Sequence, residues 1–127
     1  QPLQQVDQRV EHTLLNLTIA MAQAVVAVEI KTNPQVILQT LRQAIDALPL
    51  KANQIQIRLH PQDLAVIQQH YSAEDLVERQ WQLRAEPALE PGDIRIDAGD
   101  SSVERSLKQR LQLSLEHFLQ SADYSDL

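Results

Sequence analysis

The feature that most constrains the fold is an alternating strand that runs directly into a helix start. Apolar and polar residues alternate from 54 to 59, which predicts a strand with one buried face. The sequence then reads His-Pro-Gln-Asp over residues 60–63. Proline suits the first helical position because its missing amide would have no partner there, and Asp63 complements the helix dipole. We therefore expect a helix over about 61–70.

Two further alternating runs follow, and they flank a connection rich in proline and glycine. The first run holds Trp81, Leu83 and Ala85, and the second holds Ile94 and Ile96. This pattern predicts an antiparallel pair whose loop is too long for a tight hairpin. Trp81 is expected to anchor this small sheet, as strand aromatics commonly do.

Two segments around these runs have helical signals. Residues 72–80 fit either a short helix capped by Ser72 or a loop, and the sequence leaves both open. After Gly99 the apolar period becomes helical, so a last helix is expected from Ser101 or Ser102. Its predicted buried face carries Val103, Leu107, Leu111, Leu115 and Phe118.

The first part of the chain predicts two helices. One covers about residues 7–31 and the other about 34–48, with Asn33 as the cap and Pro34 in the first turn. The expected fold class is therefore α+β. Two N-terminal helices precede a small, mostly antiparallel three-stranded sheet with helices packed on it, and a C-terminal helix ends the fold.

The order of these elements resembles the C-terminal domain of the flagellar assembly protein FliH family. The resemblance covers roughly residues 34–120 and is densest between Leu59 and Val103. It rests on a strand, an HP-x-D-L helix, the pattern W-x-L-x-x-x-P-x-L-x-P-G-x-I-x-I, and a closing helix. The family includes type III secretion stator proteins and, more distantly, the E subunit of vacuolar-type ATPases. Where the family usually has a second glycine, this chain has Asp93.

The resemblance implies a non-catalytic stator and regulator. Such a protein binds the N-terminal region of the export ATPase as a homodimer, restrains its hydrolysis and links it to base components of the cytoplasmic export apparatus. In these terms, residues 1–32 continue an upstream coiled coil, 33–120 form the ATPase-binding domain, and 121–127 form a frayed acidic tail. The alternative is an E-like peripheral-stalk subunit of a rotary ATPase.

The first helix carries two apolar stripes, about 120–140° apart at 100° per residue. The candidate interface residues on them are Leu14, Leu17, Met21 and Val25 on one stripe, and Leu15, Ile19 and Val26 on the other. Either the helix is buried on two sides of its own domain, or one stripe faces a second copy; we favour the second interpretation. On the last helix, Leu113 is predicted to point outward and is a candidate for partner contact.

The residues needed for most site chemistry are missing or badly spaced. The chain has no cysteine and two glycines, which excludes thiolate sites and a glycine-rich phosphate loop. Its four histidines share no metal-ligand spacing, and His60 is expected to be structural. We therefore predict no catalytic residue, no cofactor and no metal site.

Charge and hydropathy argue against nucleic acid as a partner and against insertion into a membrane. Residues 61–127 hold 13 acids against 6 bases, which disfavours binding to a nucleic-acid backbone. The apolar run from Leu14 to Ile30 contains Asn16, Thr18, Gln23 and Glu29, so it is expected to be a buried helix that does not insert into a membrane.

Overall fold

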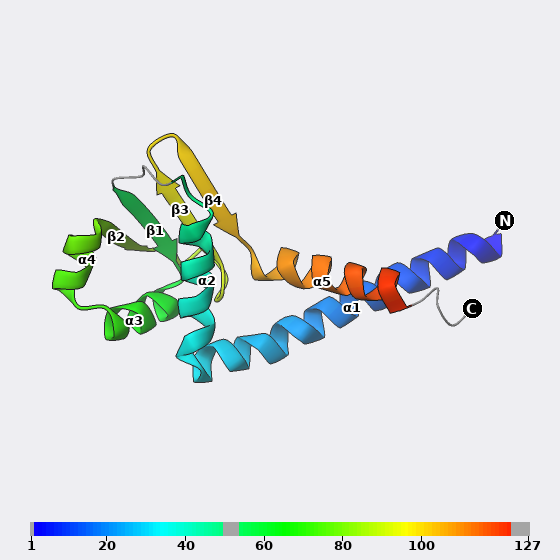
Figure 1. Cartoon of the computed structure of the whole chain (residues 1–127). Coiled ribbons are helices and arrows are strands. Elements are labelled where there is room, and N and C mark those ends of the chain that lie inside the picture. Colours follow the sequence, from blue (N-terminus) through cyan, green and yellow to red (C-terminus); the bar gives the residue numbers. More distant parts are fainter. Residues whose placement is uncertain (1, 50–53, 123–127) are drawn as a thin grey trace. The chain divides into compact units, whose positions relative to one another are not determined.

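The structure is a computed structural model that describes residues 2–49 and 54–122 (Figure 1). It divides into two compact units. Residues 27–107 form one unit, which contains the sheet. The described residues of the other unit are 2–26 and 108–122. Residues 123–127 of the predicted tail lie outside the described part of the chain.

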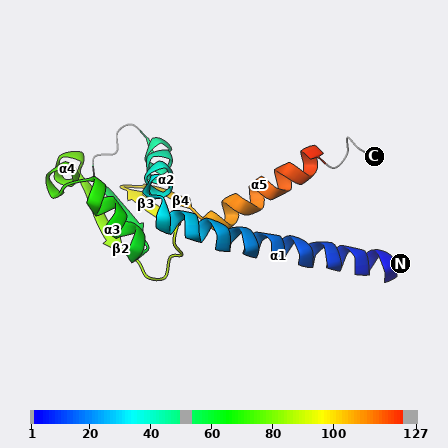
Figure 2. The same cartoon turned by 90° about the horizontal axis from the view of Figure 1, so that it is seen from below.

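Two helices open the chain, as predicted, with different bounds. Helix α1 (Pro2–Thr32) is one uninterrupted helix (Figure 2) and begins earlier than expected. Helix α2 (Pro34–Asp46) ends two residues before the predicted end. The Asn33 side chain accepts a hydrogen bond from the Gln35 amide at 3.1 Å, which confirms the predicted cap.

The sheet has four strands in the order β2-β1-β3-β4 (Figure 1). Their bounds are β1 (Ile55–Leu59), β2 (Trp81–Ala85), β3 (Ile94–Ala98) and β4 (Ser101–Arg105). Strand β1 pairs in parallel with β2, whereas the β1–β3 and β3–β4 pairs are antiparallel. The sheet is therefore mixed, and β1 and β3 are its two inner strands.

The predicted antiparallel pairing of β2 with β3 is wrong. Both strands pair with β1, one on each side. Two helices lie between β1 and β2, and they return the chain so that β2 runs in the direction of β1, as a crossover allows. The loop over residues 86–93 then crosses the end of β1 to reach β3.

A fourth strand occupies the segment where the sequence predicts the start of the last helix. Residues 101–105 pair with β3, and Gly99 and Asp100 form the two-residue turn between the two strands. Gly99 has a φ of +60°, as such a hairpin turn requires. Helix α5 (Leu107–Ala122) begins only after this strand, so Val103 lies in the sheet.

Helix α3 (Pro61–His70) has the predicted bounds, and the segment after it is helical. Helix α4 (Ala73–Arg79) begins with a capping box. The Ser72 hydroxyl accepts from the Asp75 amide at 3.1 Å, and the Asp75 carboxylate accepts from the Ser72 amide at 3.2 Å. The helix alternative for 72–80 is thereby confirmed.

Helices α2 and α3 pack against each other and on one face of the sheet. The buried cluster between them consists of Ile37, Leu38, Leu41, Ala44, Leu48, Ile55, Ile57, Leu59, Ile67, Ile94, Ile96 and Ala98. Alternate residues of β1 and β3 are buried, and those between them are polar and partly exposed. The second face of the sheet is thus hydrophilic.

Candidate interaction surfaces

Helix α1 exposes one continuous apolar stripe, which we call the outer stripe. Its residues are Leu3, Val6, Val10, Leu14, Leu17, Met21, Val25 and Val28. Leu14 is 57% exposed and Val25 is 70% exposed. The intervals are three, four and four residues, so the pattern repeats every 11 residues along the sequence.

The second stripe of α1 lies inward. Ile19 is 5% exposed and Ile30 is 4% exposed, while Leu15 and Val26 are partly buried. Of the predicted interface residues, Leu14, Leu17, Met21 and Val25 therefore lie on the exposed stripe, and Leu15, Ile19 and Val26 lie on the covered one. The interpretation in which the chain itself buries both stripes does not fit this structure.

Length and composition alone would let α1 cross a membrane over residues 3–32, and 11% of its most apolar window is buried. A single helix of this kind is weak evidence for a span, because helices of water-soluble proteins meet the same criterion. Asn16, Gln23 and Glu29 also place polar groups along the helix. The absence of membrane insertion therefore stays a prediction.

Helix α5 exposes Leu113, Phe118 and Leu119. Leu113 is 59% exposed, in keeping with its predicted outward position. Phe118 was expected on the covered face with Leu111 and Leu115, and this expectation is wrong, because it is 62% exposed while they are partly buried. Helical phase gives the face of a residue but not how far along the helix that face is covered.

Two successive residues of the 86–93 loop form hydrogen bonds that tie it to other elements. The buried Asp63 carboxylate of α3 accepts from the Gly92 amide at 2.8 Å, and the Asp93 carboxylate accepts from the Leu107 amide at 2.8 Å. Asp93 therefore supplies the first turn of α5 with an acceptor. The Asp63–Gly92 bond joins the start of α3 to the loop.

Burial raises the pKa of the Asp63 carboxyl above its ordinary value. The hydrogen bond from Gly92 and the nearby His60 oppose this rise in pKa, and Asp93 adds to it. The hydrogen bond that the carboxyl accepts comes from a backbone amide, so its contact is a structural one. It is therefore a poor candidate for acid–base catalysis, which needs a partner group placed to exchange a proton.

Gly92 lies where a side chain would not fit. Its φ is +93°, and a Cβ on it would come within 2.8 Å of Ile30 Cδ1 and 3.3 Å of Leu107 Cδ2. The end of α1 and the start of α5 thus pack on a bare backbone. This close approach explains the glycine of the Pro-Gly pair.

Trp81 lies at the edge of the core in a small aromatic cluster. Its ring meets Tyr71 edge-on with centroids 5.1 Å apart, and the Arg79 guanidinium lies 5.2 Å from each ring centroid. Such cation–π and edge-to-face contacts stabilise the Trp81 side chain beyond the effect of its burial. Trp81 anchors β2 beside α3 and α4, and β2 is an edge strand next to β1 alone.

The histidines do not form a site in the described residues. His60 caps α3, since its Nδ1 accepts from the Gln62 amide at 3.1 Å. No group of three His, Cys, Asp or Glu side chains placed to hold a metal ion occurs within residues 2–49 and 54–122. The geometry offers surfaces for contact and no assembled catalytic constellation among these residues.

A row of charged residues that is not predicted from the sequence crosses the hydrophilic face of the sheet. The strand register places Arg84 opposite Arg58, Arg58 opposite Arg95, and Arg95 opposite Glu104. Each arginine alone has the pattern of an ordinary solvent-facing strand residue. The three come together because β2 and β3 both pair with β1, one on each side, and no local signal predicts that arrangement.

Comparison with known proteins assigns the chain to a family. The family model described as "Flagellar assembly protein FliH" matches residues 1–113. The chain belongs to the FliH family. It is similar to the flagellar assembly protein FliH of Escherichia coli strain K12, with 24% identity over 110 residues that cover 87% of this chain and 48% of the relative.

The FliH of Salmonella typhimurium strain LT2 gives a similar match, with 24% identity over 110 residues, 87% of this chain and 46% of the relative. The chain therefore spans slightly less than half the length of these curated FliH relatives. The resemblance based on the HP-x-D-L and Pro-Gly patterns is confirmed at the level of the family. Asp93, which departs from the pattern of the resemblance, has a defined contact here as the acceptor for the Leu107 amide at the start of α5.

Proposed function

We propose that this chain is the C-terminal, ATPase-binding part of a flagellar export stator, and that it acts without catalysis. In this role it binds the N-terminal region of the export ATPase, restrains hydrolysis and connects the ATPase to base components of the export apparatus in the cytoplasm. Membership of the FliH family supports the flagellar role. The observation that carries the proposal furthest is the outer stripe of α1, which leaves eight large apolar residues exposed.

The outer stripe fits a second copy of the chain. Its spacing repeats every 11 residues, and such a repeat (about 3.67 residues per turn) favours a right-handed supercoil. Two α1 helices in this arrangement would bury Leu14, Leu17, Met21 and Val25 against their counterparts. Each of these side chains contributes about 1–2 kcal/mol on burial, less than a full transfer because part of its surface is already covered.

Helix α5 is the surface we assign to the ATPase. It exposes Leu113, Phe118 and Leu119 on a helix that carries no part of the sheet core. An amphipathic helix from a partner can lay its apolar side on such residues. The two proposed contacts use different helices, so they can be tested separately.

Sedimentation velocity at several concentrations tests the dimer. We expect a concentration-dependent dimer for the 127-residue chain and a monomer for Met21→Glu, because two charges would face each other across the contact. Val77→Glu is the matched control, since Val77 is also exposed, on α4, but lies off the stripe. A wild-type chain that stays monomeric at high micromolar concentration contradicts the stripe contact.

Calorimetric titration with the N-terminal segment of the cognate export ATPase tests the partner. Binding is expected, together with slower ATP hydrolysis by the full ATPase and no hydrolysis by the chain alone. If a folded chain does not bind this segment, a stalk role in a rotary ATPase becomes the better interpretation. Binding without any change in the rate of ATP hydrolysis would support the ATPase as the partner and contradict the regulatory role.

A further inference from the structure

The hydrophilic face of the sheet holds a cationic row that the proposed function does not use. The row is Arg84, Arg58 and Arg95, on the three neighbouring strands β2, β1 and β3, and it ends at Glu104 on β4. Helices α2 and α3 cover the opposite face. The row thus faces away from the core, at right angles to the strands.

The charge of this row is only partly neutralised. Arg95 pairs with Glu104 at 2.6 Å, and Arg58 donates to the Gln56 amide oxygen at 3.3 Å. Among the described residues, Arg84 has no ion pair or hydrogen bond from its side chain. Like charges directly opposite each other on adjacent strands destabilise a sheet. This cationic arrangement occurs in a chain whose net charge is −6.

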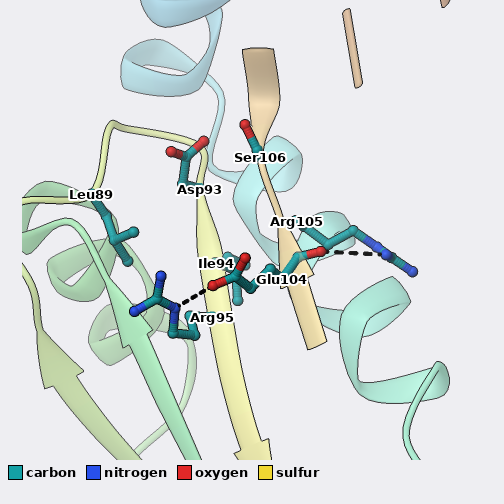
Figure 3. A pocket seen from close by; sticks show the side chains of 7 residues that line it. All are labelled: Leu89, Asp93, Ile94, Arg95, Glu104, Arg105 and Ser106. Carbon is teal, nitrogen blue, oxygen red and sulfur yellow. Dashed lines mark hydrogen bonds and ion pairs between the residues drawn. The ribbon is translucent and has the colours of Figure 1, made fainter. Parts of the chain in front are cut away.

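A cavity adjoins the Glu104 end of the row (Figure 3). It has a volume of about 200 Å³ and is lined by Leu89, Asp93, Ile94, Arg95, Glu104, Arg105 and Ser106. Figure 3 shows Arg95 reaching from β3 toward Glu104, with Leu89 on the neighbouring loop. The cavity therefore combines a guanidinium with an apolar side chain.

We propose that this face binds an acidic segment of a partner protein, with its carboxylates on the arginine row and one apolar side chain in the cavity at Leu89. Arginine binds carboxylates through two parallel hydrogen bonds, which suits the outward-facing ends of Arg84 and Arg58. This surface is separate from the α1 and α5 contacts, so the inference goes beyond the proposed function.

The spacing of the row fits such a segment. Neighbouring strands lie about 4.8 Å apart, so the three arginines span about 10 Å between their Cα atoms. Two carboxylates two residues apart on an extended segment are separated by about 7 Å, and those one turn apart on a helix by about 6 Å. Either spacing lies within reach of adjacent arginine side chains.

A nucleic acid fits this face less well. Asp97 and Glu104 lie on the same face, and Asp93 lines the cavity, so a continuous phosphate backbone would meet carboxylates beside the arginines. The row also has no aromatic side chain on which a base could stack. A short acidic segment can place its charges on the arginines alone.

Fluorescence anisotropy with a labelled peptide of six glutamates and one leucine tests the proposal. We expect binding that weakens as salt increases, and at least a tenfold loss of affinity in the double variant Arg58→Gln/Arg84→Gln. Arg42→Gln is the matched control, because Arg42 is exposed on α2, away from this face. Glu104→Gln should tighten binding severalfold by releasing Arg95 from its ion pair.

Three further measurements separate the alternatives. A peptide with glutamine in place of glutamate should not bind, and a 12-nucleotide oligothymidylate should bind more weakly than the acidic peptide. Urea denaturation should show that the double variant is at least as stable as the wild type, because it removes like-charge contacts. Unchanged affinity in both the double variant and Glu104→Gln, or tighter binding of the oligonucleotide, overturns the proposal.

Discussion

The Asp63 carboxylate accepts a hydrogen bond from the Gly92 amide at 2.8 Å, across 29 residues of sequence. Asp63 is 2% exposed, so this contact lies inside the domain. The next residue, Asp93, accepts from the Leu107 amide. Two adjacent residues thus hold the end of the 86–93 loop to α3 and to the first residue of α5.

The raised pKa of Asp63 predicts a pH-dependent stability. An acid whose folded-state pKa exceeds the unfolded one favours folding below the unfolded value, near pH 4, and loses that contribution as pH rises through the folded value. Wild type should therefore lose about 1.4 kcal/mol relative to Asp63→Asn for each unit of pKa difference. Urea denaturation of both proteins between pH 4 and about 7 measures this loss.

Asparagine is the informative replacement because its side-chain oxygen can still accept from Gly92 without a buried charge. Asp63→Ala leaves that amide without its acceptor and, relative to Asp63→Asn, should cost about 1–3 kcal/mol at every pH. Parallel pH profiles for wild type and Asp63→Asn would contradict the assignment of the pH dependence to this carboxyl.

Gly92→Ala should destabilise the domain by about 2–3 kcal/mol, because a positive φ is strained for alanine and its Cβ would meet Ile30. Gly99→Ala is the matched comparison, since Gly99 also has a positive φ and a Cβ there would have no heavy atom of the described residues within 4 Å. The difference between the two losses, measured by chemical denaturation, isolates the contact. Equal losses would mean that Ile30 moves aside without cost.

Gln80→Gly should stabilise the chain by about 0.5–1 kcal/mol. Gln80 ends α4 with a φ of +60° and a ψ of +41°, a left-handed conformation that glycine adopts without a steric penalty. Gln80→Ala, which keeps a Cβ, should give no gain. Thermal unfolding of the three proteins distinguishes them, and a lower midpoint for the glycine variant would contradict the expected relief.

Leu113→Asp should weaken binding to the export ATPase segment at least tenfold and leave the fold unchanged. The residue is exposed, and apolar contact would have to desolvate the added charge. Ser114→Asp adds the same charge to the next, also exposed, position and serves as the control. Calorimetry gives the affinities and circular dichroism checks the fold; equal binding by the two variants would remove Leu113 from the interface.

Local signals predict the helices well because the causes of these helices are local. Asn33 and Pro34 begin α2, Pro61 begins α3, and Ser72 caps α4, each through bonds within one turn. The start of α5 is misplaced by the same signals because Val103 continues the helical spacing of Leu107 and Leu111. Pairing with Ile96 places Val103 in a strand instead, and that contact is tertiary.

Strand pairing is the part of the fold that local sequence patterns do not predict. The run at Trp81 and the run at Ile94 both alternate, and alternation is the same for parallel and antiparallel neighbours. The arginine row depends on that pairing, so no sequence pattern reveals it. The two stripes of α1 are visible in the sequence, because helical periodicity alone separates Leu14 from Ile19.

The mixed sheet also has a consequence for how the chain folds. Strands β1 and β2 with α3 and α4 occupy one continuous stretch, residues 55–85, and β3 with β4 forms a hairpin over 94–105. Each piece can form through contacts close in sequence, which are made fastest. Strand β3 must then dock on β1, and the Asp63–Gly92 bond forms across that junction. We expect this late docking to limit the folding rate, so substitutions at Gly92 should slow refolding more than those within either piece.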